Sequence, residues 1–386
     1  MTLAVLQGKR LFINLWLLPL MLSLPVAGFV FRLLDVDALA FFYKATLVLA
    51  IGGIAYWVMP VRWRLVFAAA YLAYWFWAVM RFRPLGGSLA SFLGAFAYAS
   101  LLTVWLAPHV VLSRSLLLRY GLVALSVLLI LGFLWGQSRF VEPWANPNTV
   151  ALFVAALVFF VVEEKDHGWQ TWLFLALAGI LLAPLLSRSA MLVVDLVLLA
   201  RLLRTRSSRE RAAWLAVWLA FVAVTAYVFW ARGDFIAQQV GDGGRVDIVN
   251  KAVATLSAET RLYFLTGYGF GTATNAFTNL KDHQPTVLPF VHAVPSFFGG
   301  LDNTFVAALV NGGLPLVLGV AVAFFGWLVR LRGAPWPAWI EAGCLATAML
   351  VQLISLNMPE VWPPVFLWLL ALWRWHPPVR TADGER

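Results

Sequence analysis

Charged residues are scarce in this chain: Asp, Glu, Lys and Arg make up 12% of its 386 residues, whereas hydrophobic residues make up 62%. A water-soluble globule with an ordinary polar surface is therefore excluded. Cysteine is rarer still, because the chain contains only Cys344. An internal disulfide and a zinc site built from cysteines are both excluded. The composition indicates an integral membrane protein.

Acidic residues are fewer than basic ones, which gives the chain a net charge of +10. Such a balance can indicate nucleic-acid binding, but here the basic residues occur in short clusters between apolar runs. Membrane orientation explains that pattern better, so we expect no nucleic-acid partner. The first apolar run, residues 11–31, follows Lys9 and Arg10 and lacks a clear small-residue cleavage site. We expect this run to remain as a first span.

Long apolar runs dominate the rest of the sequence. A helix needs roughly 20 apolar residues to cross the hydrocarbon core of a bilayer. On that criterion we predict an all-α polytopic membrane protein with about twelve transmembrane helices in a single membrane domain, residues 1–386. The expected spans are residues 11–31, 38–59, 65–80, 88–110, 120–136, 148–162, 170–186, 189–203, 212–230, 303–329, 337–356 and 362–375.

The orientation of these spans follows from Lys and Arg, which accumulate in cytoplasmic loops. A cytoplasmic N-terminus places nearly all basic clusters inside, and the acidic run Glu163-Glu164-Lys165-Asp166 is the one loop that dissents. Both termini are then cytoplasmic. The longest polar interruption, residues 231–302 between the ninth and tenth spans, lies outside. Its prolines and glycines predict an irregular chain with short helices, one of them over residues 247–257.

Basic residues on the outer side need a reason beyond orientation. Arg188 lies between two apolar runs with almost no loop, where an ionisable group is costly unless it is paired or faces a cavity. Arg245 lies in the long outer segment, and Arg81 and Arg139 lie in short outer loops. Guanidinium groups match phosphate oxygens in a bidentate manner, which makes Arg188 and Arg245 candidate catalytic residues for a diphosphate leaving group. An interfacial arginine and a solvated loop charge are the respective alternatives.

Asp302 and Asn303 stand where the outer segment meets the next apolar run. One interpretation is a helix cap, for which both residue types are favoured. The other is functional: Asp302, or His292 ten residues earlier, accepts a proton from an attacking sugar hydroxyl, and Asn303 binds substrate. Asp282, His283 and His292 lack the spacing of helical metal ligands, so we expect no metal.

Two further outer motifs contain candidate substrate-binding residues. Trp144, Asn146 and Asn148 precede the sixth expected span, and an aromatic ring with amides suits sugar contact; a rigid turn that caps this span is the alternative. Tyr268 lies in the glycine-rich residues 267–271. A dinucleotide fingerprint would need a surrounding α/β domain, so a tight turn that returns the segment toward the membrane is the better interpretation.

Taken in order, these motifs resemble the O-antigen ligase and polymerase superfamily of bacterial envelopes. The resemblance covers roughly residues 140–330. It implies a GT-C-like membrane fold and an inverting, metal-independent glycosyltransferase without a cofactor, which takes a glycan from an undecaprenyl diphosphate carrier at the periplasmic face of the inner membrane. Arginines corresponding to Arg188 and Arg245 engage the diphosphate. The matching motifs are Trp144-Ala145-Asn146-Pro147-Asn148, Ser187-Arg188-Ser189-Ala190, Gly243-Gly244-Arg245-Val246-Asp247-Ile248, Gly267-Tyr268-Gly269-Phe270-Gly271, Asp302-Asn303-Thr304-Phe305 and Asn311-Gly312-Gly313-Leu314.

The chain departs from the family pattern in two places. The common Ser-Arg-Gly reads Ser187-Arg188-Ser189, and the His-Asn of ligases reads Asp302-Asn303, which is more similar to polymerases. We therefore expect a polymerase of undecaprenyl-diphosphate-linked repeat units, for O-antigen or exopolysaccharide. The alternatives are an O-antigen ligase that transfers glycan to lipid A core and a transporter or flippase of lipid-linked sugars. The expected partners are the glycan donor, the glycan acceptor and the lipid bilayer, with a chain-length regulator as a further candidate.

Overall fold

The computed structural model describes residues 27, 37–82, 98–108, 113–135, 147–163, 168–239, 265–267, 303–355 and 364–376. Within these ranges every regular element is a helix. The elements are α3 (Asp37–Val58), α4 (Val61–Phe82), the 3-10 helix η3 (Ser100–Leu106), α6 (Arg114–Trp135), α7 (Pro147–Glu163), α8 (Trp169–Leu185), α9 (Arg188–Arg204), α10 (Ser208–Gln239), α15 (Thr304–Phe325), the 3-10 helix η4 (Gly326–Leu331), α16 (Trp336–Ser355) and α17 (Pro364–Arg374).

The expectation of an all-α membrane protein is confirmed for the described part of the chain. Four helical stretches there are long and apolar enough to cross a membrane: Ser115–Leu134, Ser208–Ala231, Thr304–Leu331 and Trp336–Ser355. Shorter apolar helices accompany them, namely Leu49–Val58, Asn148–Glu163, Trp169–Leu185 and Val365–Arg374. The count of twelve spans remains a prediction.

Two expected elements differ from the structure, and two lie largely or wholly outside its described residues. The described part of the expected span 88–110 contains the 3-10 helix η3. Helix α10 continues to Gln239, so the first residues of the predicted outer segment extend the ninth span as helix. The expected span 11–31, apart from Ala27, and the expected short helix 247–257 lie outside the described residues.

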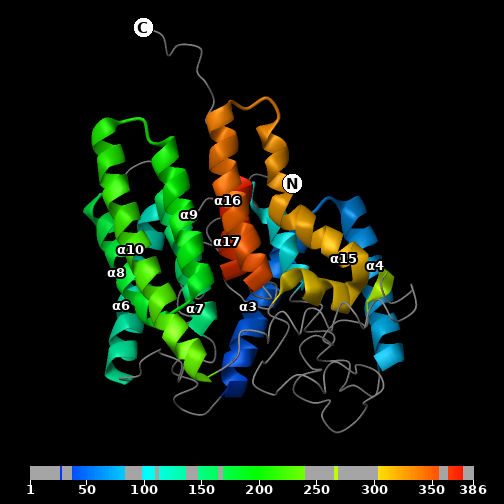
Figure 1. The fold of residues 1–386 in the computed structure, drawn as a ribbon. Helices are drawn as coiled ribbons and strands as arrows, with labels where there is room; N and C mark the ends of the chain where they lie inside the picture. The colour runs from blue at the N-terminus through cyan, green and yellow to red at the C-terminus, as the bar shows by residue number, and fades with distance from the viewer. Residues whose placement is uncertain are drawn as a thin grey trace.

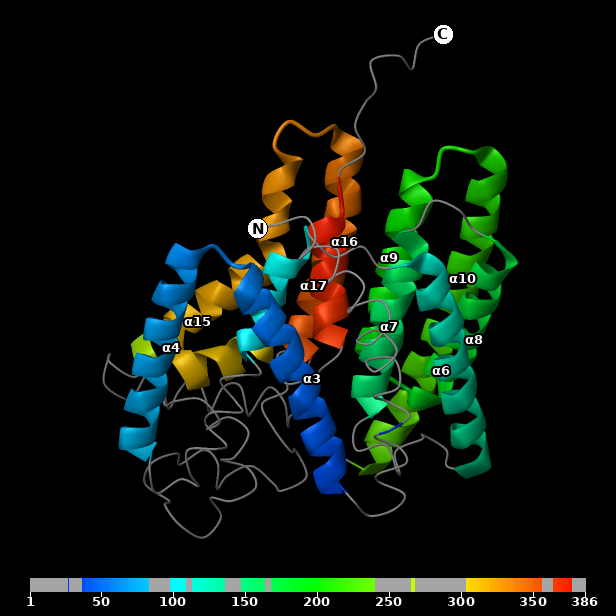
Figure 2. The same cartoon turned by 180° about the vertical axis from the view of Figure 1, so that it is seen from behind.

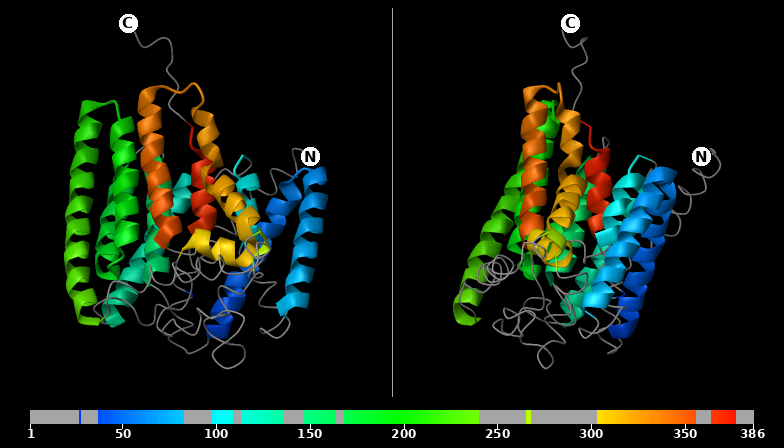
Figure 3. Two further views of the ribbon diagram at one scale, coloured as in Figure 1. Left: turned by 45° about the vertical axis from the view of Figure 1, so that its right-hand side comes forward. Right: turned by 90° about the vertical axis from the view of Figure 1, so that its right-hand side faces the viewer.

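Helix α9 lies at the centre of the packing, because it contacts α16, α10 and α7. Figures 1 and 2 show α6 to α10 grouped on one side of the molecule, α16 and α17 in the middle, and α3, α4 and α15 on the other side. Figure 3 shows that the α9–α10 and η4–α16 connections lie at the same end of the bundle. Neighbouring helices along the chain therefore run up and down through one layer of comparable height.

Two helices are apolar on all sides and form the interior. Every residue from Val150 to Val162 of α7 is buried, as is every residue from Val365 to Leu372 of α17. A helix that is hydrophobic all round lies in a protein core or faces lipid, and the burial of these residues shows that protein covers both helices. Phe159 and Trp368 join the two helices, with ring centroids 5.1 Å apart. These contacts fix α7 and α17 against each other beneath α9 and α16.

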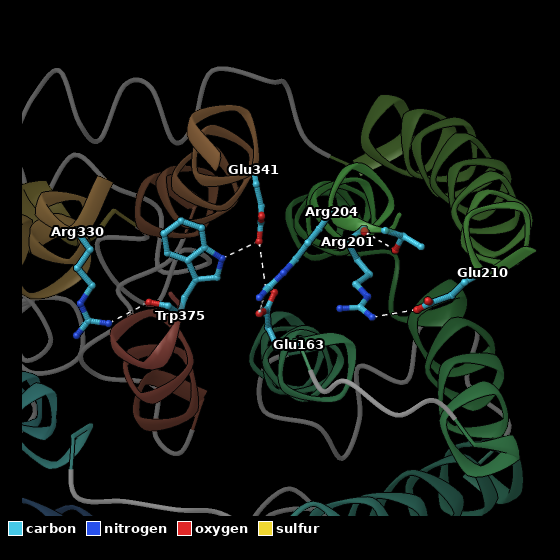
Figure 4. Close-up of polar contacts among 8 residues, drawn as sticks. Glu163, Arg201, Arg204, Glu210, Arg330, Glu341 and Trp375 are labelled. Atoms are coloured by element: carbon cyan, nitrogen blue, oxygen red, sulfur yellow. Dashed lines mark hydrogen bonds and ion pairs between the residues drawn. The ribbon is translucent and has the colours of Figure 1, made fainter. Parts of the chain in front are cut away.

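One guanidinium links three of these helices at the end that carries the α9–α10 connection (Figure 4). Arg204, the last residue of α9, places Nη1 3.0 Å from Glu163 Oε2 at the end of α7 and 3.5 Å from Glu341 Oε1 in α16. The same Glu341 oxygen accepts a hydrogen bond of 2.7 Å from Trp375 Nε1, just after α17. We call Glu163, Arg204, Glu341 and Trp375 the Arg204 network. The network explains why α7 ends with an acidic residue, Glu163, at an end of the bundle that is rich in arginine.

A second pair lies beside this network, between α9 and α10. Arg201 Nη2 is 3.0 Å from Glu210 Oε1, which also accepts a hydrogen bond of 3.3 Å from Trp214 Nε1. The guanidinium carbon of Arg201 lies 5.7 Å from the ring centroid of Trp214.

Near the end of α17, burial and then the positive charges of nearby arginines lower the pKa of the His376 imidazole, which favours its neutral form at pH 7.

We expect Arg204→Met to destabilise the bundle. The substitution leaves the Glu341 side chain, which is 2% exposed, without its positive partner. Removing one partner of a buried ion pair is strongly destabilising; because Arg204 keeps some contact with solvent, we expect a loss of about 2 kcal/mol. The midpoint of thermal unfolding in detergent should therefore fall. Arg206→Met is the matched control, since Arg206 is exposed. An equal effect of both substitutions would contradict this role of the network.

Candidate functional site

The structure describes only part of the site that the sequence predicts. The side chains of Arg188, Asn148 and Asn303 are described, and for Arg81 the structure describes the backbone of the last turn of α4. The remaining candidates lie outside the described residues: Arg139, Trp144, Asn146, Arg245, Tyr268, His292 and Asp302.

A two-residue turn places Arg188 at the start of α9. Helix α8 ends at Leu185, Leu186 adopts a left-handed conformation with φ 49° and ψ 35°, and Ser187 is extended at the N-cap of α9. Among the described residues, Leu186 is the one non-glycine residue with positive φ. Such a conformation costs roughly 1–2 kcal/mol and persists only where the surrounding structure enforces it. The expectation that Arg188 lies between two helices with almost no loop is confirmed.

The Arg188 guanidinium retains hydrogen-bonding capacity. Its carbon lies 5.3 Å from the ring centroid of Phe229 in α10, and the side chain is half-buried. Its Nε is buried and has no hydrogen-bond partner in the described part of the chain. Since a guanidinium always carries its charge and offers five N–H donors, Arg188 is available to bind an anion that reaches this end of the bundle.

A polar seam follows Arg188 along the contact between α9 and α10. Asp195 lies seven residues after Arg188, on the same face of α9, and its Oδ2 accepts a hydrogen bond of 2.6 Å from Thr225 Oγ1 of α10. Thr225 and Phe229 are one turn apart, so Arg188 and Asp195 both face α10. In the described residues, Asp195 Oδ1 and Trp218 Nε1 are buried without hydrogen-bond partners.

Asp195 was not among the candidates that the sequence suggested. An ionisable residue within an apolar helix is a functional candidate by default, because its burial is costly unless it is paired or hydrated. The signal was present, since Asp195 interrupts the otherwise apolar residues 190–200. Its partner Thr225 is thirty residues away in sequence and has no distinguishing pattern of its own.

Asn148 and Arg188 lie at the same end of the bundle. Helices α7 and α9 pack against each other and have 17 residues each, and their last residues meet in the Glu163–Arg204 ion pair. Because the two helices run in the same direction, their first turns, which contain Asn148 and Arg188, lie together at the opposite end. Figures 1 and 3 show that α15 begins at this end as well.

Asn303 is the N-cap of α15. Its Oδ1 accepts hydrogen bonds from the backbone N–H groups of Phe305, at 3.0 Å, and Val306, at 3.1 Å. For Asn303 the helix-cap interpretation is therefore confirmed, because this oxygen satisfies two of the amide donors that a helix start leaves open. Substrate binding by Asn303 remains a prediction.

Two of the glycine motifs are in contact. Gly267, the first glycine of residues 267–271, lies against the backbone of Asn311 and Gly312 in α15. The Asn311 side chain is buried, and its Nδ2 donates to Ala307 O at 2.8 Å and to Tyr98 OH at 3.4 Å. Gly267 and the Asn311-Gly312 segment belong to two motifs of the resemblance that are far apart in sequence, and they are neighbours in space.

Within the described ranges, no three His, Cys, Asp or Glu side chains are grouped so that they hold a metal ion. The expectation of metal-free chemistry concerns the whole chain and remains a prediction. No family model and no curated protein matches the sequence.

The helix-cap role of Asn303 can be tested through the stability of two variants. Asn303→Ala should destabilise the protein by about 1 kcal/mol, the usual cost of losing an N-cap side chain. Asn303→Asp keeps the accepting oxygen and should unfold at nearly the native temperature in detergent. If the aspartate variant is as unstable as the alanine variant, the cap does not account for the role of Asn303 in stability.

Proposed function

We propose that the protein is a membrane glycosyltransferase that polymerises undecaprenyl-diphosphate-linked glycan repeat units, as an O-antigen or exopolysaccharide polymerase of the bacterial inner membrane. The observation that carries the proposal is the position of Arg188. The half-buried guanidinium of Arg188 follows a strained turn at one end of the helix bundle. Its Nε is buried, and among the described residues no acceptor forms a hydrogen bond with it. Asn148 and the start of α15 lie at the same end.

The chemistry that this arrangement serves is an inverting displacement. The oxygen of an acceptor sugar hydroxyl forms a bond to the anomeric carbon of the donor glycan, the bond from that carbon to the diphosphate breaks, and the hydroxyl proton passes to a base. The bonding electrons leave with the diphosphate, which gains negative charge. A fixed guanidinium in a site of low polarity stabilises that charge without a metal ion. Arg188 has this role in the proposal, with Arg245 as a second arginine and Asp302 or His292 as the base.

The proposal includes a topology. Arg201 and Arg330 lie near the Arg204 network, and arginines accumulate on the cytoplasmic side of membrane proteins. We therefore assign the network end to the cytoplasm and the Arg188 end to the periplasm. Twelve spans, a GT-C-like fold and two cytoplasmic termini belong to the same proposal.

Substitution of Arg188 tests the function. We expect Arg188→Ala to lower glycan transfer by roughly 100-fold or more, the usual effect of removing one group that stabilises developing charge. Arg188→Lys should also be impaired, because lysine keeps the charge but loses the bidentate fork. The assay is the ladder of glycans that the purified protein makes from undecaprenyl-diphosphate repeat units.

Arg209→Ala is the control, because Arg209 is exposed and belongs to the start of α10, at the other end of the bundle. This variant should make the normal ladder. Normal transfer by Arg188→Ala would remove Arg188 from the site. Single transfer to lipid A core by the native protein, without a ladder, would identify a ligase.

One observation favours the transporter alternative enough to need a test. Helix α15 is broken at Gly313, and transporters use broken helices to bind substrate near the middle of the membrane. In this chain, however, residues Leu265–Gly267 cover the break with backbone. The ladder assay in detergent separates the two functions, because a transporter has no second compartment there and makes no new glycosidic bond.

A further inference from the structure

Two glycines with positive φ, Gly267 and Gly313, lie in the two segments that meet where residues 265–267 contact α15. Gly313 interrupts α15 with φ 64° and ψ −163°, and Gly267 has φ 68°. The conformation of Gly313 lies in a region that glycine alone populates readily. Pro315 follows in the next turn and lacks the N–H that an unbroken helix would use there. The break is thus encoded locally by glycine and proline.

The contact between residues 265–267 and residues 310–313 leaves no room for a side chain on either glycine. A Cβ added to Gly267 would lie 2.7 Å from the carbonyl carbon of Asn311, the nitrogen of Gly312 and the oxygen of Val310. A Cβ added to Gly313 would lie 2.7 Å from the nitrogen of Thr266 and would overlap the Leu265 carbonyl. All these neighbours are backbone atoms, which a rotamer change does not move. We call this contact the glycine junction.

The glycine junction lies on the break of α15, where backbone polar groups lack partners within the helix. A broken helix leaves backbone N–H and C=O groups without partners, and such groups are costly unless protein or water covers them. Leu265–Gly267 lies directly on the break. The half of α15 before the break is held separately, because Asn311 binds Ala307 and Tyr98. Figures 1 and 3 show that this half lies roughly crosswise to the long helices, while the half after the break turns to run beside α16.

We propose that the glycine junction is a positioning element of the glycan-transfer site, which holds residues 265–267 of the outer segment in one register on the break of α15. This inference depends on the proposed function, because it assigns the junction to that same site. Neither glycine contacts substrate in this proposal. The junction fixes residues 265–267 relative to the start of α15 at Asn303.

Alanine substitutions test the positioning role. Gly267→Ala and Gly313→Ala should each lower kcat for repeat-unit polymerisation at least tenfold, while KM for the lipid-linked repeat unit changes less than threefold, since small misplacements cost rate more than binding. The matched controls are Gly319→Ala in α15 and Gly343→Ala in α16, because an added Cβ meets nothing within 4 Å at either position. Both controls should retain native kcat. Native kcat in Gly267→Ala and Gly313→Ala would overturn the proposal.

A second readout tests the junction without glycan transfer. Leu265 and Leu314 are 52% and 37% exposed and flank the contact, so Leu265→Cys with Leu314→Cys should form a disulfide on oxidation in a Cys344→Ala background. Gly313→Ala should lower the yield of this disulfide several-fold, and Gly319→Ala should not. An unchanged yield in Gly313→Ala would overturn the junction. If the native protein makes no ladder but the disulfide behaves as expected, the proposed function fails and the junction itself stands.

Rescue covers the case in which Gly313→Ala does not fold. In Gly267→Ala, oxidation of the same cysteine pair should restore kcat toward that of the cysteine pair alone, because the disulfide replaces the lost contact. A variant impaired by general instability would not recover kcat on oxidation. Absence of recovery in a Gly267→Ala protein that forms the disulfide would overturn the positioning role.

Discussion

The ion pairs of Arg204 are the constraint on which the rest of the structure depends. One guanidinium contacts Glu163 of α7 and Glu341 of α16, and Glu341 in turn binds Trp375 after α17. Charges in a helix bundle are costly to bury, so a half-buried arginine with two carboxylates favours one relative height of the helices that carry them. Because α9 is a straight run of 17 residues, fixing Arg204 at one end also fixes Arg188 at the other.

The arginines at the two ends of α9 therefore differ in whether they form ion pairs with described carboxylates. At the Arg204 end, arginines are matched by Glu163, Glu210 and Glu341. At the Arg188 end, the described residues offer the guanidinium only the face of an aromatic ring. A satisfied arginine serves stability, whereas an arginine with spare donors is suited to a ligand. That difference, rather than the number of arginines, separates the structural end from the candidate functional end. Asp195 lies between the two ends, on the α10 side of the same helix.

Local patterns in the sequence predicted local structure well. In the described part of the chain, the apolar runs form helices, the short Leu186-Ser187 connection forms a two-residue turn, and Asn303 forms a helix cap, because each depends on neighbours within a few residues. The long-range partners were not predictable in the same way. Glu163 looked like an exception to the charge rule until Arg204, 41 residues later, explained it. The contact of Leu265–Gly267 with residues 310–313 of α15 likewise depends on how the chain folds back, which no local pattern encodes. Of the candidate site, Arg188 and Asn148 are now placed at one end, while Arg245, His292 and Asp302 remain predictions.

Direct binding of the leaving group tests the central claim, which is that Arg188 binds the diphosphate of a lipid-linked glycan. The affinity of purified native protein and of Arg188→Ala for undecaprenyl diphosphate without a glycan should be measured in the same detergent. Charge-assisted bidentate hydrogen bonds are worth roughly 1.5–3 kcal/mol, so Kd should rise at least tenfold in the variant. Equal affinities in the two proteins would contradict the claim.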